Sequence, residues 1–317
     1  MSDVLSFAQL PPDATRTIEF AGYEGGIEIT TYHEPFDITD TLRDPEDFHG
    51  SKEVHALVNF KGAMAGLIGD FEDNPLLPTD PKDQVAMGVL ILSNHGNDTA
   101  KRIVATLNGF ANELQANPAL YDDTKFCKQY YDATKAGYDL LNQEVPGYLQ
   151  LPKDRISVSL ERAGLVTTRL ALGESSDAVL ANEIKVVTKR AHPKDGIPSD
   201  LMVSVKWRDF DSLSKLHGAN VEIADFVNPA SWASTAAFIL ALAQRGIKPE
   251  RLIHNSIMAT EQGTAFAANV LRDIGIEPVF ISVGSSNKLS KQYYLQDPGV
   301  GDAGHVLRHF LPVWYKA

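Results

Sequence analysis

A glycine-rich segment near the carboxyl end of the chain has the residue types needed to bind a flat ligand. Three glycines fall within the six residues from Gly299 to Gly304, after Pro298 and the pair Tyr293 and Tyr294. Glycine has no Cβ and reaches positive φ at little cost, so this backbone can turn tightly and approach a ring. Its amides and carbonyls can bind the ring's edge while an aromatic side chain covers its face. A surface turn is the alternative interpretation. The candidates for binding a ring are Tyr293, Tyr294, Gly299, Gly301, Asp302 and Ala303.

Arg162 stands at the end of an apolar stretch and is followed by Ala163 and Gly164. A guanidinium group donates two parallel hydrogen bonds, so it suits an anion that carries several oxygens. The sequence therefore predicts phosphate binding by Arg162 and the backbone of Ala163. The alternative is that Arg162 pairs with Glu161 or another surface acid.

Four side chains that can carry positive charge, Lys189, Arg190, His192 and Lys194, follow a predicted strand at 184–187. A basic cluster in an acidic protein can attract phosphate or pyrophosphate from a mobile loop. We therefore predict that Lys189, Arg190 and Lys194 bind a phosphorylated donor. A solvated run of charges is the alternative interpretation.

A predicted helix start within 228–236 offers a further anion-binding segment. Hydroxyl groups and free amides at a helix amino terminus can hold a phosphate, and the helix dipole favours negative charge there. In an ordinary helix start, Asn228 or Ser231 would instead be the cap and Pro229 would occupy the first turn. The candidate phosphate ligands are Asn228, Ser231, Ser234 and Thr235.

These segments must be positioned by the elements around them. After Pro152 the sequence alternates apolar strands with helices: strands are predicted at 156–160, 184–187, 201–205, 221–227, 252–258 and 278–283, and helices at 230–245 and 263–274. Such alternation predicts an α/β fold with a mainly parallel sheet flanked by helices. Ligands of such sheets bind at the carboxyl ends of the strands. We therefore expect the candidate segments to meet at one edge of the sheet.

The first half of the chain has a different pattern. Alternating apolar and polar residues at 26–32 and 54–60 predict short strands, while 84–92 is a buried segment that favours a helix. Helices are predicted at 98–114 and 122–142. We divide the chain into a strand-rich amino-terminal extension of α+β character, residues 1–80, and an α/β domain, residues 81–317.

Composition excludes several classes of function. Of the 317 residues 44% are hydrophobic, and the net charge of -12 repels nucleic-acid polymers and anionic lipid surfaces. The single cysteine, Cys127, excludes an intrachain disulfide and a thiolate metal site. Among the nine histidines His305 and His309 are the one pair at helical ligand spacing, and no Gly-x-Ser-x-Gly elbow occurs. With no secretory signal and no apolar run near the roughly 20 residues of a membrane span, we expect a soluble, cytoplasmic protein.

The segments, taken in order, resemble the uracil phosphoribosyltransferases, a branch of the type I phosphoribosyltransferase family. The resemblance covers residues 155–311. The family's uracil-recognition signature, proline-glycine-x-glycine-aspartate-alanine-glycine, is intact at Pro298 to Gly304, and its arginine-alanine-glycine loop is similar to Arg162 to Gly164. Its alanine-proline-glutamate-glycine turn resembles Ala259 to Gly263, with a substitution and an extra residue.

The resemblance implies that a nucleobase nitrogen displaces pyrophosphate from phosphoribosyl pyrophosphate. It implies Mg²⁺ held by the substrate pyrophosphate rather than by protein ligands, and a homodimer. Arg162 would hold pyrophosphate, Lys189 to Lys194 would close over it, and Gly299 to Ala303 would bind the base, with Asp302 orienting either that turn or a base-bound water. The protein's contribution would be positioning and charge stabilisation.

One segment departs from the family. Where the family has aspartate-proline-x-x-alanine-threonine-glycine-glycine, this chain has Asn228 in place of the aspartate, and Ser234 and Thr235 in place of the paired glycines. Asn228, Arg162 and Asp302 are the candidate catalytic residues. Two explanations remain open: an enzyme with altered base or donor specificity, or a catalytically silent protein that binds a nucleobase or nucleotide as a sensor or partner subunit.

Overall fold

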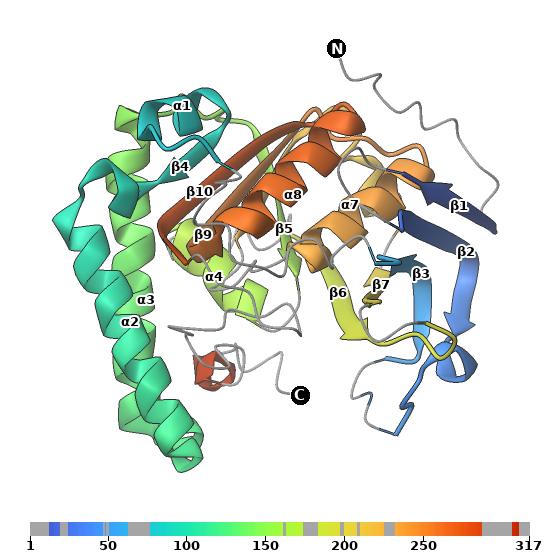
Figure 1. Ribbon diagram of the computed structural model, residues 1–317, viewed down its shortest axis with the longest axis horizontal. Coiled ribbons are helices and arrows are strands. Elements are labelled where there is room, and N and C mark those ends of the chain that lie inside the picture. The colour runs from blue at the N-terminus through green and yellow to red at the C-terminus, as the bar shows by residue number, and fades with distance from the viewer. Residues whose placement is uncertain are drawn as a thin grey trace.

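The computed structural model describes residues 13–19, 25–46, 48, 51–62, 77–160, 163–173, 183–196, 200–207, 210–224, 232–286 and 306–310 (Figure 1). In these residues ten strands form one sheet in the order β1-β2-β3-β7-β6-β5-β8-β9-β10-β4. The strands are β1 Ala14–Ile18, β2 Ile27–Asp37, β3 Glu53–Asn59, β4 Val89–Ile91, β5 Arg155–Leu160, β6 Ile184–Ala191, β7 Met202–Trp207, β8 Asn220–Ala224, β9 Arg251–Thr260 and β10 Glu277–Ser286.

One half of the sheet is parallel. Strands β6, β5, β8, β9, β10 and β4 all run in the same direction. Most residues of β4, β5 and β8 are buried, and every residue of β9 after Arg251 is buried. Such runs fit parallel strands that are covered on both faces. The carboxyl ends of these strands therefore share one edge of the sheet.

The other half is antiparallel. β7 pairs with β6, β3 with β7, β2 with β3, and β1 with β2. The strands of the amino-terminal region thus extend the same sheet as the later strands, a pairing that the sequence did not indicate. β2 begins with alternating buried and half-buried residues, as expected for a strand with one face toward the core.

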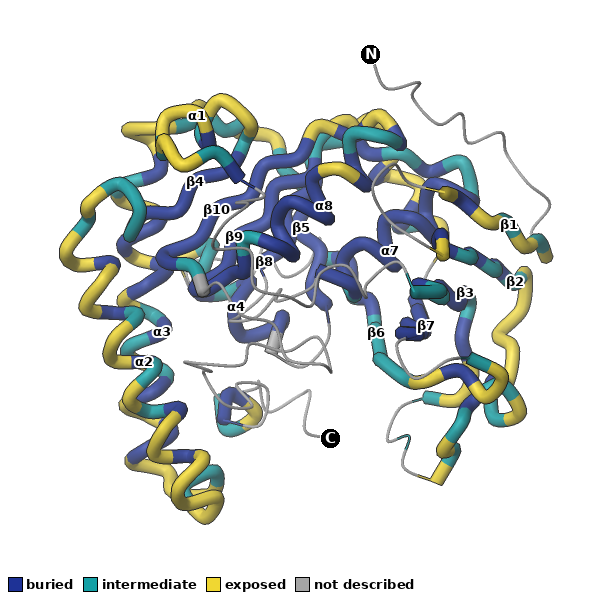
Figure 2. Tube along the Cα trace, in the orientation of Figure 1, coloured by how far each residue is buried: buried dark blue, intermediate teal, exposed yellow. Residues whose placement is uncertain are grey.

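The helices cover both faces of the parallel half. They are α1 Pro81–Ala86, α2 Asp98–Ala116, α3 Thr124–Glu144, α4 Ala163–Ala171, α6 Phe210–Ser214, α7 Ala233–Gln244 and α8 Glu261–Asp273. Gly137 of α3 lies against Ile257 and Val283, whereas Trp232, just before α7, packs on His254 and Phe280. Because successive strand residues point to opposite faces, α3 and α7 lie on opposite sides of the sheet. Both layers are visible in Figure 2, where α7 and the central strands are buried and the outer sides of α2 and α3 are exposed.

Local sequence explains where the long helices begin. The side chain of Asn97 accepts a hydrogen bond from the amide of Ala100 at the start of α2, and Asp123 accepts from Lys125 and Phe126 at the start of α3. α7 is apolar on all sides and is buried along nearly its whole length. A helix of that composition needs covering on every side, which fits its contacts with β2, β3, β6 and β7 of the sheet and with α8 beside it.

The predicted α/β fold, with a sheet flanked by helices, is confirmed. Two predictions of local structure were wrong. Of the segment 84–92, expected to be helical, only the first part lies in α1; Val89–Ile91 is the edge strand β4. β6 continues past 187 to Ala191 because β7 pairs with it along that length. No helix in the described residues is both long and apolar enough to cross a membrane.

Candidate functional site

The strand order reverses direction between β5 and β8. From β5 the chain passes through α4 to β6 on one side, and from β8 it passes through α7 to β9 on the other. Helices α4 and α7 belong to opposite faces of the sheet. In open α/β sheets ligands bind at the carboxyl ends of the strands at such a reversal. The candidate site is therefore the edge where β5 ends at Leu160 and β8 ends at Ala224.

A buried threonine ties these two strand ends together. The hydroxyl of Thr167, in the first turns of α4, lies 2.6 Å from the carbonyl oxygen of Ala224 and 3.1 Å from that of Gly164. Thr167 is fully buried. The helix that follows β5 is therefore bound to the last residue of β8, and the connections leaving the two strands begin side by side.

The turn after β9 is fixed by a helix cap. Thr260 ends the strand, and its side-chain oxygen accepts a hydrogen bond from the amide of Gly263 at 2.9 Å. Glu261 opens α8, and burial raises the pKa of its carboxyl. This is the turn that resembles the family's alanine-proline-glutamate-glycine segment, and it leaves the same sheet edge as Leu160 and Ala224.

α7 begins in an unusual way. Trp232, the residue before it, has φ of 56° and a buried side chain, and it donates no side-chain cap to the helix. In the described residues α7 begins at Ala233, with Trp232 as its N-cap, and the predicted capping candidates Asn228 and Ser231 lie outside the described residues. Thr235 is buried in the first turn of α7, and Ser234 is half-buried. Both hydroxyl residues therefore stand at the amino end of a helix that follows β8.

The cationic segment lies in and after a strand rather than in a mobile loop. β5 ends where Leu160 pairs with Val186, so Lys189 and Arg190 belong to the part of β6 that extends beyond the edge of β5. The amide of Lys194 donates to the carbonyl of Thr41 at 2.8 Å, and the amide of Arg43 donates to the carbonyl of His192 at 3.0 Å. These backbone hydrogen bonds hold the segment against the amino-terminal region.

A cluster of two hydroxyls and a carboxyl lies beside β5. Ser159 and Thr168 are buried, with their hydroxyl oxygens 2.8 Å apart, and Ser159 also donates to the carboxylate of Glu183. Burial raises the pKa of Glu183 to about 7, against the opposing charges of Lys185 and Arg169. The sequence analysis did not single out these residues. The available signal was the pair of serines, Ser157 and Ser159, in β5.

We predict that replacing Glu183 with glutamine removes a pH dependence of stability. The folded-state pKa of about 7 lies above the ordinary value of 4.5, so the stabilisation is complete below pH 4.5 and is lost as the pH rises to about 7. The full shift corresponds to roughly 3 kcal/mol, and partial exposure of the group reduces the expected effect to about 1–2 kcal/mol. Urea unfolding of the wild type and of Glu183→Gln, at several pH values between 4.5 and 8, measures the free energy of unfolding of each. Parallel stability curves for the two proteins would contradict the assignment.

The segment after the glycine-rich turn is anchored to the start of α3. Val306 and Leu307 are buried. Arg308 forms an ion pair with Asp122 at 2.6 Å, and the Nε2 atom of His309 lies 2.9 Å from the carbonyl oxygen of Tyr121. Phe310 stacks on Tyr131 of α3, with ring centroids 4.4 Å apart. Figure 1 shows this segment, in red, on the side of the sheet toward which β6 points.

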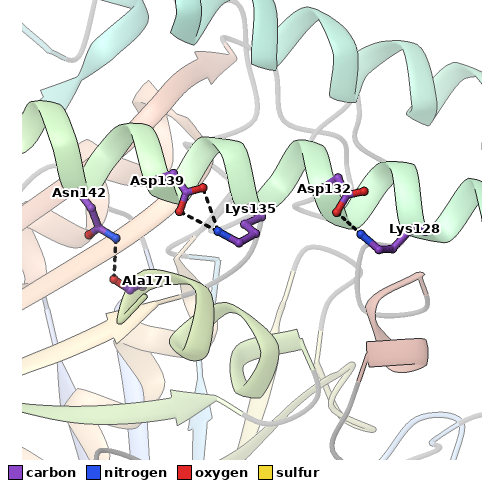
Figure 3. A network of polar contacts seen from close by, with 6 residues as sticks. All are labelled: Lys128, Asp132, Lys135, Asp139, Asn142 and Ala171. Carbon is purple, nitrogen blue, oxygen red and sulfur yellow. Dashed lines mark hydrogen bonds and ion pairs between the residues drawn. The ribbon is translucent and has the colours of Figure 1, made fainter. Parts of the chain in front are cut away.

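α3 also supports α4. The side-chain amide of Asn142 donates to the carbonyl oxygen of Ala171 at 3.0 Å, while the ion pairs Lys128–Asp132 and Lys135–Asp139 follow one side of the helix (Figure 3). The two ends of α3 therefore hold the helix after β5 and the segment after the glycine-rich turn. One helix, α3, therefore contacts both α4, which begins at the predicted phosphate subsite, and residues 306–310, which follow the predicted ring-binding segment.

Several predicted site residues lie outside the described residues: Arg162, Asn228, Ser231, Tyr293, Tyr294, Gly299, Gly301, Asp302 and Ala303. The roles of these residues stay predictions. Ala163 is described: it is the first residue of α4, three positions after the end of β5 at Leu160. Among the described residues no three His, Cys, Asp or Glu side chains are grouped to hold a metal ion.

No protein-family model and no curated protein matches the chain. Solved structures with a similar fold include the AQ2163 protein from Aquifex aeolicus, at 18% identity and a TM-score of 0.42, over 69% of this chain and 97% of that chain. Another is the APRTase from Giardia lamblia in complex with 9-deazaadenine, at 13% identity and a TM-score of 0.31, over 55% and 84%.

A third is the adenine phosphoribosyl transferase from Trypanosoma brucei in complex with AMP, pyrophosphate and ribose-5-phosphate. It is 14% identical, with a TM-score of 0.32, over 56% of this chain and 72% of that chain. Phosphoribosyltransferases are thus among the structural neighbours, at low sequence identity. Likeness at this level concerns the fold alone.

Proposed function

We propose that the protein transfers a phosphoribosyl group from phosphoribosyl pyrophosphate, or a related sugar-phosphate donor, to a uracil-like nucleobase or related heterocycle. The observation that carries this proposal is the intact seven-residue signature from Pro298 to Gly304. Its support in the fold is the common sheet edge at which β5, β8 and β9 end.

The reaction would be a displacement at the anomeric carbon of the ribose. A ring nitrogen of the base forms the new bond to that carbon, the bond from the carbon to the pyrophosphate oxygen breaks, and the nitrogen's proton passes to solvent. Mg²⁺ would be held by the donor pyrophosphate rather than by protein side chains and would offset negative charge on the leaving group. Arg162 and the amide of Ala163 would bind the same group, since α4 starts at the end of β5. The hydroxyls of Ser234 and Thr235, at the start of α7, would donate hydrogen bonds to the phosphate of the sugar.

A catalytically silent binding protein is the second candidate. Two residues favour it. Asn228 stands where the family has an aspartate, so the segment expected to bind the donor lacks that carboxylate, and the buried indole of Trp232 precedes the first turn of α7. A hydrogen bond to a charged group contributes roughly 1.5–3 kcal/mol against about 1 for a neutral one. The amide can still accept from a ribose hydroxyl, so donor binding could persist with weaker catalysis.

One experiment separates the two candidates. The protein is screened against nucleobases and ribose phosphates by calorimetry, with and without Mg²⁺, and the ligands that bind are then assayed for pyrophosphate release. We expect a pyrimidine base and phosphoribosyl pyrophosphate to bind and pyrophosphate to be released. Binding without release would identify the silent protein, and no binding of any base would contradict both.

The base subsite has its own test. In Gly301→Val the added side chain would fill the space of the ring, so base affinity should fall at least about 100-fold while donor affinity is unchanged. Gly109→Val is the control: Gly109 lies in α2, far along the chain from the signature, and an added Cβ there meets no atom within 4 Å. Normal base binding by the Gly301 variant would exclude the signature as the base subsite.

A further inference from the structure

A cavity lies toward the opposite edge of the sheet from the candidate site. Its volume is about 260 Å³, and residues of the end of α3, the connection to β5 and the end of α4 line it. Most of its lining is apolar, including Leu141, Leu149 and Ala171. Arg155, which lines it, is the first residue of β5, whereas the candidate site lies beyond the last residue, Leu160. The cavity is therefore separate from the proposed base and donor subsites.

Three polar side chains form the floor of this cavity: Arg155 from β5, Glu222 from β8 and Asn255 from β9. Glu222 is only 5% exposed. Its Oε1 atom accepts from the amide of Asn255 at 2.6 Å and from Nη1 of Arg155 at 3.4 Å. Its Oε2 atom lies 3.3 Å from Nε of Arg155, yet accepts no hydrogen bond from any described residue.

An incompletely satisfied carboxylate of this kind is costly to bury. Burial raises the pKa of Glu222, although Arg155 and Asn255 both favour its charged form. A buried charge is tolerated when it is paired and its remaining acceptor sites are filled. A ligand that donates to Oε2 would complete the hydrogen bonding of Glu222, and the guanidinium of Arg155 has further donors for an acceptor on the same ligand.

The charges restrict what that ligand can be. A simple anion would meet the carboxylate of Glu222, and a simple cation would meet Arg155 and Lys153, which also lines the cavity. A zwitterion satisfies both, with an ammonium group on Glu222 and a carboxylate on Arg155. The apolar walls then require an apolar remainder. The cavity is smaller than the roughly 300–1,000 Å³ of pockets for drug-sized ligands, so the molecule must be small.

We propose that this cavity binds a free α-amino acid with an apolar side chain, of the size of leucine or phenylalanine. The ammonium group donates to Oε2 of Glu222, the carboxylate accepts from Arg155, and the side chain packs against Leu141 and Leu149. The proposal does not depend on phosphoribosyl transfer, because binding at this edge requires none of the residues of the candidate site.

The test uses the full chain and two leucine analogues, each of which lacks one of the two charged groups of the amino acid. Leucine or phenylalanine should raise the melting temperature in a concentration-dependent way, with binding confirmed by calorimetry. 4-Methylpentanoate lacks the ammonium group and 3-methylbutylamine lacks the carboxylate, so each should bind at least about tenfold more weakly than leucine. Equal binding of either analogue, or no response to any apolar amino acid at about 10 mM, would overturn the proposal.

A pair of matched variants locates the site. Glu222→Gln keeps the shape and the acceptor of Asn255's hydrogen bond but removes the charge, and should lower leucine affinity at least about tenfold. Glu277→Gln is the control, because Glu277 also pairs with an arginine of the neighbouring strand, Arg251, at 2.5 Å, but is exposed and does not line the cavity. Unchanged leucine affinity in the Glu222 variant, or an equal loss in both variants, would place the ligand elsewhere.

Discussion

Replacing Trp232 with alanine should lower the free energy of unfolding by about 3–5 kcal/mol, the range for removing a large aromatic side chain from a core. The indole is 1% exposed and is among the largest fully buried side chains in the described residues. Its ring contacts those of His254 and Phe280 edge-on, at centroid distances of 3.9 and 4.3 Å. Truncation would leave a cavity between the sheet and the start of α7.

The left-handed backbone of Trp232 makes this prediction more specific. A φ of 56° costs a bulky residue of order 1–3 kcal/mol, so packing of the ring must outweigh the strain. Trp232→Gly should therefore be less destabilising than Trp232→Ala, since glycine loses the same contacts but relieves the backbone. The usual order, in which alanine is preferred to glycine, would show that the backbone is not strained there.

Trp232→Phe is the conservative comparison. The indole nitrogen is buried without a hydrogen-bond partner among the described residues, so phenylalanine removes an unsatisfied donor while keeping an aromatic ring. We expect a loss of about 1–2 kcal/mol. Urea unfolding, extrapolated to zero denaturant, measures all three variants. A loss below about 1 kcal/mol for the alanine variant would mean that the ring is not part of the core.

The elements of the second half of the chain could be predicted because their signals are local. Segments such as 252–258 are too short for a typical helix, and the glycine and proline between 246 and 249 mark the end of α7. β4 could not be predicted, since a three-residue apolar run has no periodicity of its own. It is a strand only because β10 lies beside it.

The sequence predicts where the candidate site lies, at the ends of the parallel strands, but not the long-range contacts that hold it together. Alternation of strands and helices is enough to place the ends of β5, β8 and β9 at one edge. The hydrogen bond from Thr167 to Ala224 joins residues 57 positions apart, and no local pattern indicates it. The pairing of β3 with β7 likewise depends on long-range register, so the extension of the sheet by the amino-terminal strands had no sequence signal.

The length of β6 changes the role expected of the basic residues. The sequence predicts Lys189 and Arg190 in a loop after the strand, whereas both lie within β6, in a part that is only half-buried. Adjacent strand residues point to opposite faces, so only one of the two side chains can face a ligand at the edge of β5. Donor binding through this segment should thus respond to one of the two substitutions to alanine and not to both.

Replacing Arg162 with alanine should weaken binding of magnesium pyrophosphate by roughly 3 kcal/mol, about 100-fold. Arg162 directly precedes α4, and a guanidinium group in that position would donate two charge-assisted hydrogen bonds to one phosphoryl group. The fold should be unaffected, because α4 is held independently by Thr167 and by the hydrogen bond from Asn142 to Ala171.

Calorimetric titration of inorganic pyrophosphate in the presence of Mg²⁺ measures the effect. Arg251→Ala is the matched control, since Arg251 opens β9 at the opposite edge of the sheet and pairs with Glu277. Arg162→Lys separates charge from geometry: lysine keeps the charge but not the paired donors, so it should recover only part of the affinity. Pyrophosphate affinity that is the same in Arg162→Ala as in the wild type would remove this arginine from the donor site, and with it the main cationic support for phosphoribosyl transfer.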